Sequence, residues 1–230
     1  MWTLIERGGP WVMTPLMATS VVALAFVIER AVFWARLSRA RSRDLVEEFL
    51  SLSDRGEYDA AARAAHGSRD PVVRVLHSGL VHRNYDLTSA LEMSASAEVS
   101  RAERFLGVLD TIITLAPLLG ILGTVTGIIQ SFGLLSETVT IEDPRAATGG
   151  IAQALITTAT GLVIAIAALI PHNVFRALAD SLRRETEEAA TRLEIVFRKR
   201  AGEGEAVPPR EPGRGGGGKV PRIEDDVRLA

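Results

Sequence analysis

Residues 116–132 read APLLGILGTVTGIIQSF, and they lie within a longer run, residues 111–136, that holds no charged side chain. An α-helix rises about 1.5 Å per residue, so about 20 residues cross the ~30 Å hydrocarbon core of a bilayer. The run is therefore long enough to span a membrane. Its glycines recur at steps of three and four, at Gly120, Gly123 and Gly127, which gives the helix one nearly bare face that a second helix can approach closely.

Two further runs, residues 8–28 and 146–175, also contain no charged side chain. Each is long enough to cross a bilayer as a helix. The remaining segments carry all of the 26 basic and 28 acidic residues of the 230-residue chain. The sequence therefore predicts an all-α integral membrane protein with three transmembrane helices, and with long helices that extend into the cytoplasm.

The composition excludes several classes of function. The chain has no cysteine, which removes disulfide frameworks, thiolate metal sites and thiol nucleophiles. A formal net charge of −2 gives no general attraction to nucleic acid. We find no nucleophile–base pair, phosphate-binding loop or metal-ligand cluster, so we expect neither enzymatic activity nor a cofactor.

Basic residues near the membrane gather on one side of the predicted spans. Five arginines lie between positions 30 and 43, and others precede the second span and follow the third, whereas the two opposite segments hold one arginine each. Cytoplasmic loops carry such an excess of Lys and Arg. The expected orientation places the amino terminus outside and the carboxyl terminus inside.

The first run has a second interpretation. Met13–Val27 resembles the apolar part of a secretory signal, and Ala23-Leu24-Ala25 imitates a cleavage site. No acidic residue occurs between positions 30 and 43, where the five arginines lie. That pattern favours a helix retained in the membrane.

The segment between the first two spans is predicted to contain three or more helices, separated at residues 54–56, 67–71 and 83–85, with Asp86 capping the last one. Beyond the third span, an apolar stripe predicts an amphipathic helix. Its members are Phe175, Leu178, Leu182, Ala189, Leu193 and Val196.

The end of the chain, from Ala201 onward, is rich in Gly and Pro and is predicted to be disordered. The expected organisation is an outer amino-terminal segment (1–10), transmembrane helix 1 (11–35), a cytoplasmic helical region (36–105), transmembrane helix 2 (106–135), an outer loop (136–148), transmembrane helix 3 (149–173), a cytoplasmic amphipathic helix (174–200) and a disordered tail (201–230).

The small and hydroxyl residues of the second and third spans have two interpretations. In the first, they only pack helices together, and the threonines bond to carbonyls of their own helix. In the second, hydroxyl and amide groups line a narrow polar path for an ion, because they can stabilise a charge without being charged themselves. The candidate pore-lining residues are Thr124, Thr158, Gln153 and Thr157. The candidate packing residues are Pro117, Gly120, Gly123, Gly127, Ala154, Gly161 and Ala165.

A proton path usually includes an ionisable group, and the three uncharged runs contain only His172 of this kind. It lies near the cytoplasmic end of the third span, where we expect a solvated side chain rather than a relay. Asp110 and Glu29 lie at the ends of their spans, where solvation is again expected. If protons cross here, we expect the titrating carboxylate to belong to another chain.

The two motifs resemble a known family. Residues 116–132, quoted above, and residues 151–173, IAQALITTATGLVIAIAALIPHN, are similar to the paired signature of the MotA/TolQ/ExbB proton channel family. The close similarity runs from Thr111 to Asn173, and the length and short outer loop favour the ExbB/TolQ branch. The resemblance implies a multi-pass protein of the bacterial inner membrane.

The resemblance also implies partners and a mechanism. A homo-oligomer, a pentamer in the family, would surround single-span ExbD/TolR-like partners whose membrane aspartate carries the proton, and membrane lipid would surround the assembly. A threonine in each motif faces that aspartate, and the matching positions are Thr124 and Thr158. Inward proton flow would then use the proton-motive force to drive transport or other work on the envelope.

Two positions depart from the family pattern. Gln153 stands where many relatives carry glutamate, and it cannot titrate. Ala167 stands where proline is usual, with Pro171 one turn later. The lack of a titrating group leaves a second hypothesis, a membrane scaffold that holds single-span partner proteins and conducts nothing.

Overall fold

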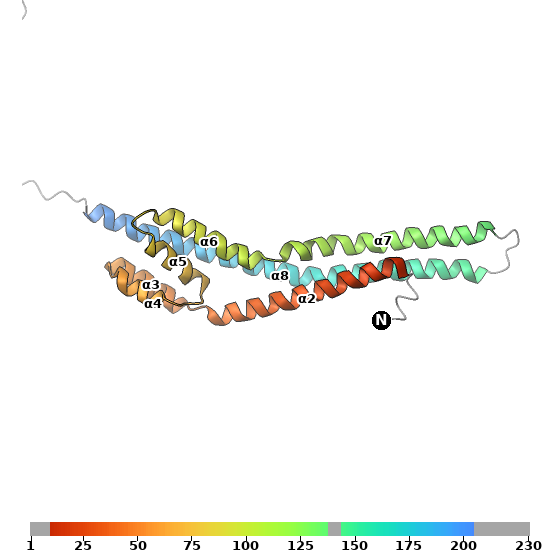
Figure 1. Ribbon diagram of the computed structural model, residues 1–230, viewed down its shortest axis with the longest axis horizontal. Coiled ribbons are helices and arrows are strands. Elements are labelled where there is room, and N and C mark those ends of the chain that lie inside the picture. The colour runs from red at the N-terminus through yellow and green to blue at the C-terminus, as the bar shows by residue number, and fades with distance from the viewer. Residues whose placement is uncertain (1–9, 138–143, 205–230) are drawn as a thin grey trace, which may run out of the picture.

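The computed structural model describes residues 10–137 and 144–204, and nearly all of this part of the chain is helical. The molecule is elongated (Figure 1). Its helices are α2 (Pro10–Ala40), α3 (Arg43–Arg55), α4 (Tyr58–Ala65), α5 (Pro71–Val81), α6 (Leu87–Glu103), α7 (Leu106–Glu137) and α8 (Pro144–Gly204). Residues 1–9 of the predicted amino-terminal segment, 138–143 of the predicted outer loop and 205–230 of the predicted tail lie outside the described residues. The described part of that loop is helical, and residues 201–204 form the end of α8.

Three stretches of helix in the described part are long and apolar enough to cross a membrane, and they lie in α2, in α6–α7 and in α8. The predicted all-helical fold class with three spans is confirmed at this level. Residues 149–173 and 174–200, predicted as a transmembrane helix and a cytoplasmic amphipathic helix, lie in one continuous helix, because the change to charged side chains does not interrupt the backbone hydrogen bonds.

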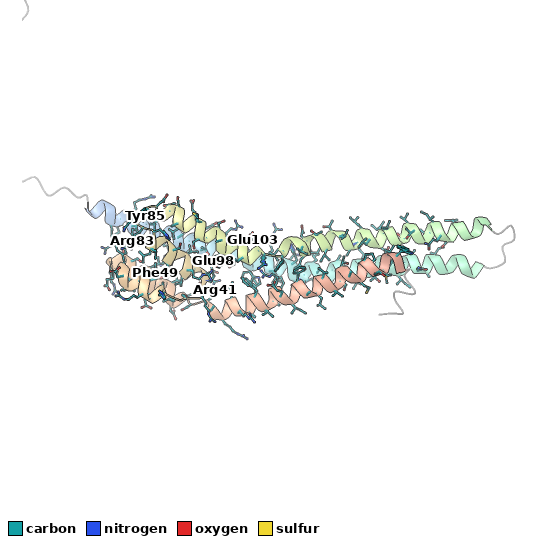
Figure 2. All side chains as sticks on the ribbon, viewed as in Figure 1. Arg41, Phe49, Arg83, Tyr85, Glu98 and Glu103 are labelled. Carbon is teal, nitrogen blue, oxygen red and sulfur yellow. The ribbon has the colours of Figure 1, made fainter. Side chains whose placement is uncertain are left out.

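The described helices enclose two hydrophobic cores, and α8 contributes to both. In one half of the molecule, α2, α7 and α8 lie side by side and bury Leu16, Leu109 and Ala168 among others. In the other half, α3–α6 surround the distal part of α8 and bury Phe49, Leu76 and other side chains. Figure 2 places the labelled charged residues, such as Arg41 and Glu98, in this second half. We call the two halves the three-helix half and the bundle half.

The helix boundaries in the bundle half follow from local capping. The side chains of Ser42, Asp70 and Asp86 each accept a hydrogen bond from a backbone N–H in the first turn of the next helix. Asp86 was the predicted cap, and the predicted breaks agree with the observed helix ends. One predicted stripe residue is wrong: Leu178 is exposed and Ala179 is buried instead, since the buried face of α8 turns slightly as it passes from one core to the other.

A two-residue break at Arg104 and Phe105, here called the α6–α7 bend, separates α6 from α7, and the buried side chain of Arg30 contacts it. Phe105 at the bend has a φ of 68°, a left-handed conformation that is costly for a residue with a side chain. Arg30 of α2 is 2% exposed and donates hydrogen bonds to the carbonyl oxygens of Arg101 and Ala102, at 3.1 and 3.4 Å. Its charge is balanced by the Glu29 carboxylate at 2.5 Å. Arg30 therefore ties α2 to the end of α6.

Candidate ion-conducting helix pair

The predicted site residues lie on α7 and α8, which run antiparallel with their backbones close together (Figure 1). A Cβ atom added to Gly120 would lie 3.0 Å from the Cα atom of Thr158, and one added to Gly161 would lie 2.5 Å from the carbonyl oxygen of Ala116. Only glycine fits such positions without displacing backbone. A packing role for Gly120 and Gly161 would require this close approach of the two backbones.

Thr158 makes a hydrogen bond between the two helices. Its Oγ1 donates to the backbone carbonyl oxygen of Gly120 at 2.8 Å. The bare face of Gly120 brings this carbonyl within reach, since no side chain covers it. The donated proton fixes the direction of the hydroxyl and leaves its lone pairs able to accept a hydrogen bond from another group.

Thr124 follows Gly120 by four residues, about 6 Å along the helix. Its Oγ1 donates to the carbonyl oxygen of Ile121 at 2.7 Å, within its own helix, and the side chain is half-buried. The structure therefore brings Thr124 and Thr158 to within about one turn of each other along the helix pair. Both hydroxyls have their protons engaged, so toward an approaching acid they act as acceptors.

Thr157 lies inside the helix pair. It is fully buried, its Oγ1 donates to the carbonyl oxygen of Gln153 at 3.0 Å, and its methyl group fills the space left by Gly123. Gln153 is half-buried one turn away. Within one chain, Thr157 is therefore a packing residue, and its predicted contribution to a pore lining remains a prediction.

The remaining packing residues continue the close approach of the two helices. Gly127 faces Ala154, Ala165 is buried in the core of the three-helix half, and Pro117 is half-buried within α7. One contact was not predicted: Ser131 is 3% exposed and lies against Gly150. Its spacing of four from Gly127 was the available signal, since it continues the same face.

Charged and titratable side chains lie at the end of this helix pair next to the bundle half. His172 on α8 is 5% exposed, so the expectation of a solvated side chain is wrong. A cavity of about 400 Å³ at the α6–α7 bend is lined by this histidine together with Asp110, Arg176 and other charged side chains. Within the described residues, Nδ1 of His172 has no hydrogen-bond partner. Titratable groups therefore surround the boundary between the two halves.

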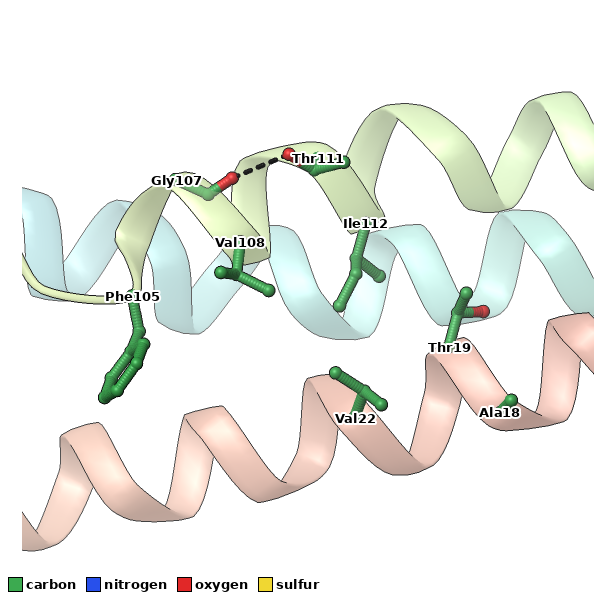
Figure 3. A pocket seen from close by; sticks show the side chains of 8 residues that line it. All are labelled: Ala18, Thr19, Val22, Phe105, Gly107, Val108, Thr111 and Ile112. Atoms are coloured by element: carbon green, nitrogen blue, oxygen red, sulfur yellow. Dashed lines mark hydrogen bonds between the residues drawn. The ribbon is translucent and has the colours of Figure 1, made fainter.

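A second opening, between α2 and α7, has the opposite character. This groove of about 620 Å³ is lined mainly by apolar side chains such as Val22 and Phe105 (Figure 3). Its two hydroxyls bond within their own helices, Thr19 to the carbonyl oxygen of Leu16 and Thr111 to that of Gly107, each at 2.8 Å. The groove offers no polar path, so the α7–α8 pair is the better candidate for ion conduction.

Comparison with known proteins adds independent information. The model of a family described as the MotA/TolQ/ExbB proton channel family matches residues 68–188, which include all of α5, α6 and α7 and much of α8. The chain is 36% identical over 196 residues to the ExbB-like 3 biopolymer transport protein of Synechocystis sp., covering 84% of this chain and 93% of that protein.

Two further relatives are similar over most of their length. The biopolymer transport protein ExbB of Salmonella typhimurium is 29% identical over 205 residues, covering 80% of each chain. The Tol-Pal system protein TolQ of Pseudomonas aeruginosa is 30% identical over 205 residues, covering 79% of this chain and 85% of that protein.

Proposed function

The chain belongs to the MotA/TolQ/ExbB proton channel family, and on that premise we propose that it is a proton-channel subunit of the bacterial inner membrane. With an ExbD/TolR-like single-span partner, it would use the proton-motive force to drive transport or other envelope work. The family and the names of the relatives support energy transduction for biopolymer transport.

The observation that carries the proposal is the hydrogen bond between Thr158 and the Gly120 carbonyl, one turn from Thr124. It places two fixed hydroxyl acceptors on a helix pair without any charged side chain between residues 111 and 136 or between 146 and 175. Such hydroxyl oxygens can accept a hydrogen bond from a protonated carboxylic acid on a partner helix, and they add no charge of their own to the path. The carboxylate itself would come from the partner.

Apolar surface supports an assembly of several copies in lipid. α7 exposes Leu118, Ile121 and Val125, and α8 exposes Val163 and Ile166. A single soluble chain rarely exposes so continuous an apolar surface. In the proposed arrangement, copies of the chain, five as in the family, cover part of this surface and lipid covers the rest. The amino terminus would lie outside and the bundle half in the cytoplasm, as the arginine distribution favours.

The proposal predicts that Thr158→Ala lowers proton flux. The purified complex with its single-span partner, reconstituted in liposomes with a pH-sensitive dye, should conduct about tenfold more slowly, because one acceptor worth about 1.4 kcal/mol is lost. Thr158→Ser keeps the hydroxyl and should conduct normally. Thr160→Ala is the matched control, since Thr160 Oγ1 donates to Ile156 within its own helix.

Assembly is measured on the same samples by co-purification of the partner. Lower flux with intact assembly supports the assigned role of Thr158, and unchanged flux in Thr158→Ala contradicts it.

The alternative function is a scaffold for single-span proteins. It is favoured by Gln153, which lies one turn from Thr157 and cannot titrate. A scaffold would co-purify with its partner and give no flux above that of empty liposomes. Recovery of a single-span protein with an aspartate just inside its apolar segment, together with flux, would exclude the scaffold.

A further inference from the structure

The outer face of α2 changes from apolar to basic along a single line. Val21, Leu24, Ile28 and Val32 are 62%, 61%, 54% and 44% exposed, and their spacing of three and four places them on one face of the helix. The same spacing continues to Arg36 and Arg39. The apolar part, from residue 21 to residue 32, is about 17 Å long, close to the ~15 Å thickness of the hydrocarbon part of one leaflet.

A cavity of about 870 Å³ opens where this face becomes basic. Arg36 and Arg39 line it from α2, and Arg69 and Arg74 line it from the connection to α5 and from α5 itself. The apolar side chains Val32, Phe33 and Leu37 form part of its wall. Arginines from two segments far apart in the sequence therefore converge on one cavity, which the orientation rule for membrane proteins alone does not require.

Three of these arginines keep their charge uncompensated. Arg74 is paired with Glu98, and the Glu29 carboxylate at the cavity edge is bound by Arg30. Among the residues that the structure describes, no carboxylate pairs with Arg36, Arg39 or Arg69. The cavity therefore has a surplus of positive charge beside an apolar surface.

The positions of the two arginine segments are fixed relative to each other by Asp70. Its Oδ2 accepts a hydrogen bond from the backbone N–H of Ser42 at 2.7 Å, and its Oδ1 accepts one from that of Val72 at 2.9 Å. Asp70 is 2% exposed. Asp70 directly follows Arg69 in the sequence. Its hydrogen bond to Ser42, three residues after Arg39, therefore ties the Arg69 segment to the α2–α3 turn. The arginines are thus held together by a buried bridge.

We propose that this cavity binds the headgroup of an anionic glycerophospholipid, with the acyl chains lying along the apolar face of α2. Guanidinium groups form strong, directional hydrogen bonds to phosphate oxygens, and basic pockets at the membrane surface select anionic headgroups. The length of the apolar face is what distinguishes a lipid from a free anion or an acidic peptide, because only a lipid also needs ~15 Å of apolar surface next to the phosphate.

The test uses the full-length protein, purified in mild detergent and depleted of lipid. Phosphatidylglycerol added in mixed micelles should raise its melting temperature, and phosphatidylcholine should not. In Arg36→Gln/Arg39→Gln/Arg69→Gln, the affinity for phosphatidylglycerol should fall by about fivefold per arginine removed, roughly a hundredfold in total. The control Arg55→Gln/Arg63→Gln/Arg198→Gln removes the same charge from exposed arginines of the bundle half and should bind like the parent.

The single variant Arg69→Gln is used if the triple variant does not fold, because Arg69 is exposed and lies between helices. Binding of phosphatidylglycerol about fivefold weaker than that of the parent protein supports the site.

Three results would overturn the proposal. They are equal binding of the two lipids, an equal loss of affinity in the control variant, and a melting-temperature rise from inorganic phosphate alone equal to that from the lipid. A tenfold gain in lipid affinity after removal of residues 205–230 would also overturn it, because Glu224, Asp225 and Asp226 would then be the occupants. No measurement here requires proton flux, so the result is independent of the proposed channel function.

Discussion

At the scale of single residues, the contact between Gly123 and Thr157 limits how closely α7 and α8 approach. A Cβ atom at position 123 would overlap the Thr157 methyl group and lie 2.8 Å from its Cβ. Threonine has restricted χ1 rotation in a helix, and Thr157 is fully buried, so it has little room to move. We expect Gly123→Ala to lower the free energy of unfolding by about 1–3 kcal/mol, measured by denaturant titration in mixed micelles.

Gly107→Ala is the matched control. A Cβ atom at Gly107 would meet nothing within 4 Å, so this variant should be neutral or more stable by up to about 1 kcal/mol. Thr157→Ser removes the overlapping methyl group and should restore more than half of the loss in the Gly123→Ala background. Equal destabilisation by the two alanine variants would show that helix propensity, and not this contact, dominates.

At the scale of elements, the bend between α6 and α7 contains a strained backbone conformation at Phe105, and contacts of the Phe105 ring offset part of its cost. Phe105 adopts a φ of 68°, and its ring lies 4.8 Å from that of Phe26 and 5.5 Å from the Arg30 guanidinium, centre to centre. Phe105→Ala removes these contacts and keeps the strain, whereas Phe105→Gly removes both. We expect the glycine variant to be more stable than the alanine variant by about 1 kcal/mol, compared by thermal unfolding. The usual order, with alanine more stable, would mean that the bend relaxes.

The elements differ in how far the sequence predicts them. The spans and the breaks in the bundle half are predictable because charge, length and capping are local properties. The burial of Arg30 is not, since its carbonyl partners lie far along the chain, at Arg101 and Ala102. The sequence alone also does not show where the third span ends within the long helix α8, because a change from apolar to charged composition resembles a boundary. This change in composition alters what surrounds the helix and does not end it.

The candidate site shows the same division. The spacing of Gly120, Gly123 and Gly127 predicts a close helix contact and identifies the face that makes it. The partner of Thr158 depends on the register between α7 and α8, and no local pattern contains that register. The burial of His172 likewise depends on α6 and α7 closing over it, so a position near the end of a span gave the wrong expectation.

At the scale of the whole molecule, α8 links the two halves as one helix about 90 Å long. It is anchored in the bundle half where Arg192 donates two hydrogen bonds to the Glu47 carboxylate, at 2.6 and 2.7 Å. These bonds hold the pKa of Glu47 below its usual value. A displacement of α8 in the three-helix half would therefore be carried into the bundle half by a continuous backbone, which is a suitable connection for a protein that converts ion flow into work.

The orientation of this assembly can be tested directly, because the chain has no cysteine and single-cysteine labelling has no background. Ser51 and Ser96 are exposed in the bundle half, and positions 3 and 138 lie in the two segments with few basic residues. The arginine distribution favours a cytoplasmic bundle half. A membrane-impermeant maleimide added to intact spheroplasts should therefore label Thr3→Cys and Thr138→Cys, and should leave Ser51→Cys and Ser96→Cys unlabelled. Inverted membrane vesicles should give the reverse result.

Leu155→Cys is the control, since Leu155 is 64% exposed on an apolar face of α8 and should be labelled from neither side when lipid or a neighbouring copy covers it. Labelling of Ser51→Cys from outside would reverse the orientation. Labelling of positions 51 and 138 from the same side would contradict the second span, because an odd number of crossings must separate them. The expected labelling pattern would place the cavity lined by His172 and Asp110, at the α6–α7 bend, on the cytoplasmic side of the α7–α8 helix pair.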